Sequence, residues 1–133
     1  MNGPLPLPAD ASVLGVGIDL VGIARMRAAL ARTPRLESRV FSSRERLGAE
    51  AHPDAAVRFA SSFAVKEAVV KSLGIGLSDV TLHVIELVDG HHGPELVIGG
   101  HAGSVAESRG VVGWIHRIEI TDRRVVAVVV PRG

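Results

Sequence analysis

The sequence predicts an α+β fold in which a largely antiparallel sheet packs against one long helix. The order of the predicted elements is the first reason, because one strand is followed by helices and then by two hairpins. Strands and helices that are segregated along the chain are typical of α+β folds. The second reason is a long run with helical spacing, residues 55–73, which can cover one face of a sheet.

Length and composition fit a single domain. The chain has 133 residues, of which 47% are hydrophobic, so it can bury a substantial core. We expect residues 1–12, which contain three prolines, to form a flexible N-terminal tail, and residues 13–133 to form the domain. The tail lacks a signal-peptide pattern, and no uncharged run reaches the ~18 residues of a membrane span, so no membrane partner is expected.

Charge and aromatic content argue against nucleic-acid binding. Fifteen basic and fourteen acidic residues leave a net charge of +1, too balanced for binding a phosphate backbone through bulk charge. Aromatic residues make up 3%, too few for the stacking platforms that bind single strands. The absence of cysteine removes disulfides, thiolate nucleophiles and cysteine-ligated zinc, and favours a cytoplasmic protein.

The first strand and helix carry the first candidate residues. Residues 13–21 alternate between apolar side chains and small or polar ones, which predicts a strand. One face of this strand is apolar, and the other carries Gly15, Gly17 and Asp19. Residues 22–32 have helical spacing, and Thr33-Pro34 ends the helix. Arg25 and Arg32 are seven residues apart and therefore share one helix face.

The next helices are marked by their caps. A capping-box pattern from Ser42 to Glu45 predicts a short helix, and Asp54 is expected to cap a helix over residues 55–73 that stops at Gly74. In that long helix Glu67 and Lys71 follow two alanines at helical spacing, which leaves room for another backbone or a ligand.

The second half of the chain predicts two hairpins. Residues 80–88 and 94–100 read as strands around the turn 89–93, and residues 101–110 as a short helix or loop. Residues 113–121 and 125–131 form the closing hairpin. His91 and His92 lie in the first turn, and we assign them no metal site because no third ligand has recognisable spacing.

The charged residues have ordinary explanations. Glu67 and Lys71 can form an exposed i, i+4 ion pair, Lys66 can lay its stem along apolar residues with its ammonium in water, and Asp19 can cap a turn or pair with an arginine. Together, however, a strand carboxylate and a helix carboxylate can hold a hard cation such as Mg²⁺, with a lysine one turn away to meet a phosphate.

Two sequence blocks, "GIDLVGIARM" and "RFASSFAVKEAVVKSLGIG", resemble the holo-acyl-carrier-protein synthase family, within the 4'-phosphopantetheinyl transferases. Weaker similarity extends over nearly all of residues 13–131. The resemblance implies a fold of that type and an enzyme that moves phosphopantetheine from coenzyme A to a serine of an acyl carrier protein, serving either a fatty-acid or a polyketide pathway.

The resemblance also implies roles for individual residues. Asp19 and Glu67 match the family's metal carboxylates, with Mg²⁺ as the cofactor, and Glu67 and Lys71 match its catalytic pair. Lys71, Gly74 and His116 correspond to coenzyme A contacts, where His116 fits only after a one-residue shift of register. Arg25 matches an arginine that docks the carrier protein, and Arg32 extends the same face. Family members form homotrimers with an active site at each subunit boundary.

Several positions depart from the family pattern. Ser62 replaces an arginine, Ile75 replaces a hydroxyl residue, the Gly93-Pro94 turn lacks a basic residue, and Glu119 stands where a serine is expected. Because several of these changes fall where the family binds the nucleotide, three functions stay open: a transferase with unusual coenzyme A contacts, an enzyme for another pyrophosphate substrate, and a non-catalytic carrier-protein binder.

Overall fold

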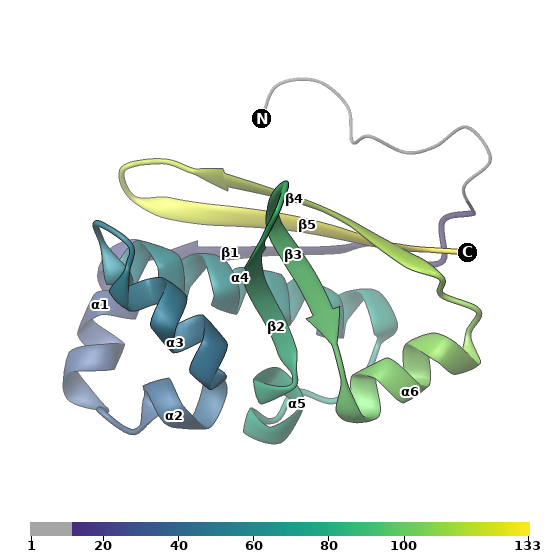
Figure 1. The fold of residues 1–133 in the computed structure, drawn as a ribbon, viewed down its shortest axis with the longest axis horizontal. Helices are drawn as coiled ribbons and strands as arrows, with labels where there is room; N and C mark the ends of the chain where they lie inside the picture. The colour runs from purple at the N-terminus through teal and green to yellow at the C-terminus, as the bar shows by residue number, and fades with distance from the viewer. Residues whose placement is uncertain (1–11) are drawn as a thin grey trace.

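The structure of the protein is a computed structural model, in which residues 12–133 are described. Of the tail expected over residues 1–12, residues 1–11 therefore lie outside the described residues. Figure 1 shows a curved sheet above a long helix, with short helices at both ends and a separate hairpin crossing in front. The elements are β1 (Gly17–Gly22), α1 (Ile23–Arg32), α2 (Leu36–Val40), α3 (Ser43–Glu50), α4 (Ala55–Leu73), α5 (Asp79–His83), β2 (Ile85–Gly90), β3 (Gly93–Ile98), α6 (Gly100–Ser108), β4 (Gly113–Ile120) and β5 (Arg124–Arg132).

The strands form two antiparallel sheets. The larger has the order β1-β5-β4, so β1 and β4 are its edge strands, and the smaller is the β2-β3 hairpin. Helix α4 lies along one face of the larger sheet, and α1 to α3 gather at one end of it (Figure 1). The predicted α+β architecture with a long covering helix is confirmed. None of the helices in the described part of the chain combines the length and apolar character needed to cross a membrane.

Strand β1 turns its glycine and aspartate face toward α4. A Cβ built on Gly17 would lie 1.7 Å from the carbonyl oxygen of Ala68, so any side chain there would clash with the helix backbone. The opposite face is apolar and open: Val16, Ile18 and Leu20 are 54%, 56% and 53% exposed. The sheet thus packs through its small residues and leaves its larger apolar side chains outside.

Helix α4 begins and ends where its caps predict. The Asp54 carboxylate accepts from the Ala56 N–H and also pairs with Arg27, and Gly74 ends the helix in the left-handed conformation with φ 63°. The helix supplies much of the core, including buried Phe59, Val65, Val69 and other apolar side chains.

Two predicted elements are corrected by the structure, and one helix was missed. Residues 80–88 are not one strand, because residues 79–83 form α5, whose cap Ser78 accepts from the Thr81 N–H and whose Leu82 is buried. The first strand begins at Gly17 rather than Val13, which makes only an isolated bridge with Arg132. Helix α2 was not predicted, because its five residues are too few to show a clear period.

Lys66 is buried, which contradicts the exposed position expected for its ammonium. The side chain is 0% exposed, and its Nζ donates to Glu45 Oε1 at 2.6 Å, to the Leu82 carbonyl at 2.6 Å and to the Ile85 carbonyl. Glu45 in turn accepts from the backbone N–H groups of Ser42 and Leu87. Every donor of the ammonium is satisfied, and the ion pair joins α4 to α3, α5 and β2.

We expect Lys66→Met to destabilise the fold by about 3–5 kcal/mol, because it leaves the Glu45 carboxylate buried without its partner. Urea denaturation of Lys66→Met and of Lys66→Met/Glu45→Gln measures the effect. The double variant should recover part of the loss, since its amide needs no counter-charge. A single variant within 1 kcal/mol of wild type would contradict this account.

Candidate functional site

A groove of about 380 Å³ lies where β1 meets α1 and α4. It brings together two carboxylates, two arginines and an apolar floor. The lining residues are Asp19, Leu20, Val21, Gly22, Arg25, Met26, Ala29, Arg32, Leu36, Phe63 and Glu67. Four residues singled out from the sequence, Asp19, Glu67, Arg25 and Arg32, thus meet in one place.

Asp19 reaches α4 because β1 approaches that helix so closely. Its side chain is 10% exposed, and Oδ1 accepts a hydrogen bond of 2.8 Å from Lys71 Nζ. Lys71 also donates to the Ile18 carbonyl at 3.3 Å. The hydrogen bond to Asp19 raises the pKa of Lys71, so the ammonium stays charged. Lys71 therefore pairs with the strand carboxylate, and the simple i, i+4 pair with Glu67 is not its main contact.

Glu67 lies beside Asp19 in the same groove. Partial burial raises the pKa of its carboxyl, the negative charge of Asp19 raises it further, and Lys71 acts in the opposite direction. Two carboxylates therefore share one ammonium. This arrangement favours either a proton on Glu67 or a further positive charge between the two groups.

The groove offers two protein ligands to a cation. In residues 12–133 no cluster of three or more histidine, aspartate or glutamate side chains is placed to hold a metal. Magnesium commonly uses one or two protein carboxylates and completes its shell with water and substrate phosphate. The donor set of Asp19 and Glu67 fits that pattern.

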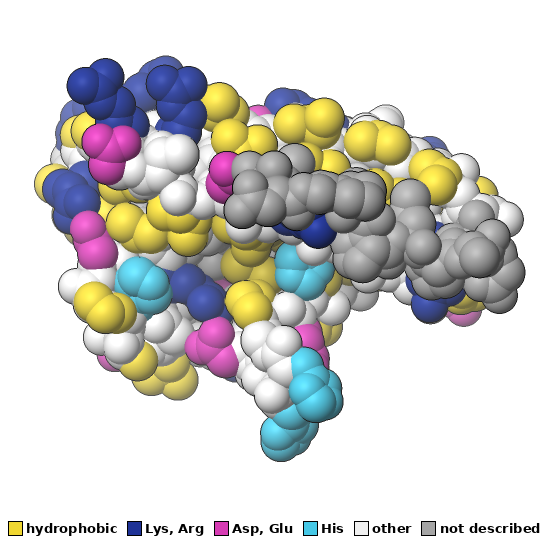
Figure 2. All heavy atoms as spheres, turned by 90° about the horizontal axis from the view of Figure 1, so that it is seen from above, with side chains coloured by type: hydrophobic (Ala, Val, Ile, Leu, Met, Phe, Trp, Pro, Cys, Tyr) yellow, Lys and Arg dark blue, Asp and Glu magenta, His cyan; other side chains and the backbone are white. Residues whose placement is uncertain are grey.

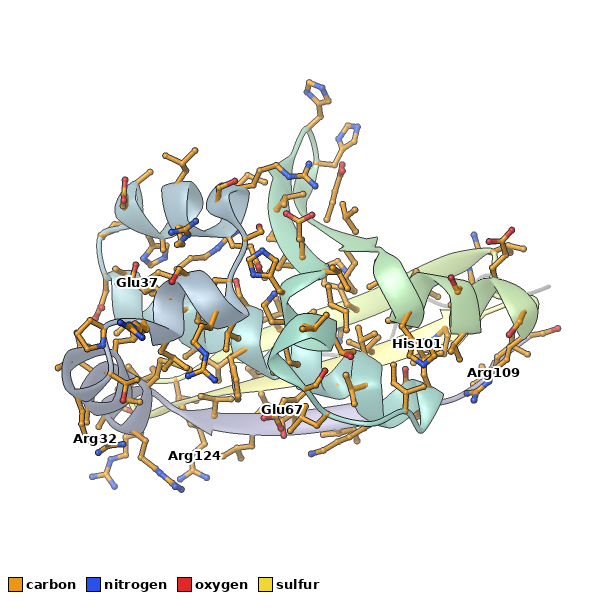
Figure 3. The ribbon with its side chains drawn as sticks, turned by 90° about the horizontal axis from the view of Figure 1, so that it is seen from below. Arg32, Glu37, Glu67, His101, Arg109 and Arg124 are labelled. Atoms are coloured by element: carbon orange, nitrogen blue, oxygen red, sulfur yellow. The ribbon has the colours of Figure 1, made fainter. Side chains whose placement is uncertain are left out.

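Arg25 and Arg32 stand at the outer side of the groove and are exposed. Buried Met26 and half-buried Phe63 also line the groove. Figure 3 shows Arg32 and Glu67 on the side of the molecule away from the β2-β3 hairpin. The groove is thus lined by two exposed arginines, by apolar side chains and by two carboxylates.

The other predicted coenzyme A contacts are not in this groove. Gly74 lies one turn beyond Lys71 and is exposed. His116 lines a second hollow of about 370 Å³ together with Pro94 and Trp114. Burial lowers the pKa of His116, so the imidazole is neutral at pH 7. The two hollows belong to opposite edges of the larger sheet, one at β1 and the other at β4.

The departing residues have distinct environments. Ser62 is 1% exposed inside the fold, and Ile75 packs against the core. Gly93, with φ 107°, and Pro94 begin β3. Glu119 pairs with Val126, whereas His116 pairs with Val129, so the two side chains point to opposite faces of β4. Glu119 is therefore turned away from the hollow that contains His116.

Comparisons with known proteins agree with one another. The family model described as 4'-phosphopantetheinyl transferase superfamily matches residues 15–129. The holo-[acyl-carrier-protein] synthase of Desulforudis audaxviator is 37% identical over 123 residues, covering 91% of this chain and 94% of that protein.

Solved structures show the same likeness. The holo-ACP-synthase of Plasmodium yoelii has a TM-score of 0.79 at 25% identity and covers 92% of this chain and 97% of that one. An ACPS–CoA complex from Chronobacterium ammoniagenes has a TM-score of 0.78 at 26% identity, with 89% and 96% covered.

We expect Glu67→Gln to stabilise the protein at pH 7 in the absence of divalent cations, because it removes a charge that the folded state disfavours. The folded-state pKa of Glu67 lies above its unfolded value. The stability cost is therefore present above the folded pKa and disappears as the pH falls below the unfolded value. Thermal unfolding from pH 4 to 8 should show the gain shrinking with falling pH, and a constant difference would contradict it.

Proposed function

This chain belongs to the 4'-phosphopantetheinyl transferase superfamily, and from that premise we propose that the groove between β1, α1 and α4 is its active site. The resemblance seen in the sequence is confirmed by the family match and by relatives named holo-[acyl-carrier-protein] synthase. The chain is a phosphopantetheinyl transferase, which transfers 4'-phosphopantetheine from coenzyme A to a serine of an acyl carrier protein.

The meeting of Asp19, Glu67 and Lys71 is the observation that supports this site. In the transfer, the serine oxygen forms a bond to the phosphopantetheine phosphorus while the bond to the departing adenosine 3',5'-bisphosphate breaks. The serine loses its proton, and negative charge develops on the phosphate oxygens. Lys71 supplies a fixed positive charge for those oxygens.

Glu67 is proposed as the general base that accepts the serine proton, directly or through a water. Its raised pKa moves it toward the working pH, which suits a group that takes up and releases a proton. Asp19, which accepts a hydrogen bond from Lys71, lies next to Glu67, and its charge raises the pKa of Glu67 and so increases its basicity.

Mg²⁺ is proposed as the cofactor, held by Asp19 and Glu67. The fit rests on two adjacent carboxylates balanced by a single ammonium. When bound, the ion supplies positive charge that neutralises the pyrophosphate oxygens. In its absence the same carboxylates repel each other, so the empty pair disfavours an anionic substrate.

The remaining contacts follow the resemblance. Arg25 and Arg32 are proposed to bind the acidic surface of the carrier protein, and the apolar residues of the groove to receive it. Lys71, Gly74 and His116 are proposed to contact coenzyme A, the first two from the α4 end and His116 from the second hollow. A cytoplasmic location stays a prediction, based on the lack of cysteine.

A homotrimer is proposed because one chain does not bring the two hollows together. They lie on opposite edges of the sheet, at β1 and at β4, so a head-to-tail ring of subunits can place one against the other. The exposed apolar face of Val16, Ile18 and Leu20 supports self-association. In Figure 2 hydrophobic side chains run along this sheet, with Lys and Arg side chains at the α1 end.

We expect Asp19→Ala and Glu67→Ala each to reduce transfer at least about 100-fold, because each removes charge needed around the reacting phosphate. The assay incubates an apo carrier protein with coenzyme A and Mg²⁺ and follows the gain of one phosphopantetheine in the carrier's mass. Glu107→Ala, an exposed carboxylate on α6, is the control. Undiminished transfer by Asp19→Ala would remove this site from consideration, and carrier binding without transfer by wild type would favour the non-catalytic alternative.

We expect Ile18→Asp to convert the trimer to monomers, because it places a charge in the apolar face, and to reduce transfer with it. Light scattering at the assay concentration measures the mass. Leu47→Asp is the matched control, since Leu47 is 65% exposed on α3, away from the sheet. A monomeric, fully active wild type would refute the trimer.

A further inference from the structure

The turn between β4 and β5 lies against the start of α1. The Ile23 N–H donates to the Arg123 carbonyl at 2.9 Å, and Gly22 pairs with Arg124 in the sheet register. The turn itself is held by Thr121, whose side chain accepts from the N–H groups of Arg123 and Arg124. Two arginines that are almost a hundred residues from α1 in sequence are therefore fixed beside it.

Arg124 lies at the α1 end of the sheet, on the face of Ile18 and Leu20 and opposite the face of Asp19. Paired residues of an antiparallel sheet project from the same face, so Arg124 shares the face of Leu20, two residues before its partner Gly22. Both Leu20 and Gly22 line the groove. In Figure 3, Arg124 and Arg32 extend at the same end of the molecule, on the side where Glu67 lies.

In the part of the chain that the structure describes, the arginines around the groove lack the carboxylate partners that several other arginines have. Arg27, Arg44 and Arg58 form ion pairs with Asp54, Glu86 and Asp89. No carboxylate in residues 12–133 forms such a pair with Arg25 or Arg124, and both are exposed. In a single chain their charges are thus available to an acidic partner, and they reinforce one another because they lie at one end of the protein. Arg124 stands at the α1 end of the face proposed for self-association, so the docking role requires this end to stay outside the contact between subunits.

We propose that Arg124, supported by Arg123, forms the second edge of the carrier-protein docking surface, opposite the edge formed by Arg25 and Arg32. This inference rests on the proposed function. An acidic helix of the carrier lies between the α1 arginines and the β4-β5 turn, which directs the carrier's serine along the apolar floor toward Asp19 and Glu67. Arg124 thereby selects for carriers with acidic residues on both sides of the serine-bearing segment.

The test compares Arg124→Glu with Arg132→Glu. The two arginines stand at opposite ends of β5 on the same face, roughly 26 Å apart at about 3.3 Å per residue. The charge change is identical, and the two positions differ in place and in exposure, since Arg124 is exposed and Arg132 is half-buried over Gly113. We expect Arg124→Glu to raise the KM for an acidic carrier protein about tenfold, with kcat and the KM for coenzyme A unchanged. Arg132→Glu should behave as wild type, and Arg124→Lys should retain most of the affinity.

Salt separates a charge effect from a structural one. The difference between Arg124→Glu and wild type should shrink as ionic strength rises from 0.05 to roughly 0.5 M, since exposed charges are screened within a Debye length. An unchanged KM in Arg124→Glu, while wild type transfers phosphopantetheine and Arg25→Glu is impaired, would overturn the inference and leave the proposed function intact. Wild type that does not transfer would instead refute the proposed function.

Light scattering supplies the last criterion. If Arg124→Glu changes the mass of the assembly, Arg124 contacts another copy of the chain and the docking role is overturned. An unchanged mass together with the raised KM supports the docking role.

Discussion

The close approach of β1 to α4 is the constraint on which the site depends. The strand can reach the helix backbone only because Gly17 has no side chain at the point where it faces Ala68. Two residues further, on the same strand face, Asp19 meets Lys71 and comes next to Glu67. If β1 lay a side chain's width further from α4, the two carboxylates would be separated. The glycine in β1 is therefore needed to bring the reactive groups together.

The features that depend on local patterns are visible in the sequence. The bounds of α4 follow from Asp54 and Gly74. Helical periodicity places Glu67 on the same side of the helix as two alanines. The pairing of Asp19 with Lys71 did not follow, because it joins residues on elements whose relative position no pattern specifies. The same holds for Arg124, whose place beside α1 is set by the sheet register and is not visible in the spacing of the basic residues.

Burial was harder to predict than secondary structure. The alternation of apolar and small residues in β1 separates the two faces of the strand, but it does not say which face packs against a helix. In the structure the small residues face α4, while Ile18 and Leu20 face outward. Lys66 was expected in water because most lysines are there. Its burial requires three acceptors that come from α3, α5 and the start of β2, and their convergence is a property of the tertiary fold alone.

The buried ammonium of Lys66 also fixes the orientation of the neighbouring residue. Lys66 and Glu67 are consecutive, so their side chains leave α4 about 100° apart around its axis. A rotation of the helix by roughly 10° would move a side-chain end about 6 Å from the axis by about 1 Å. Displacements of that size change reaction rates by about a hundredfold. The three acceptors of Lys66 thus keep α4 from rotating about its axis. Sequence changes in α3, α5 or β2 can therefore alter the transfer rate without changing a residue of the groove.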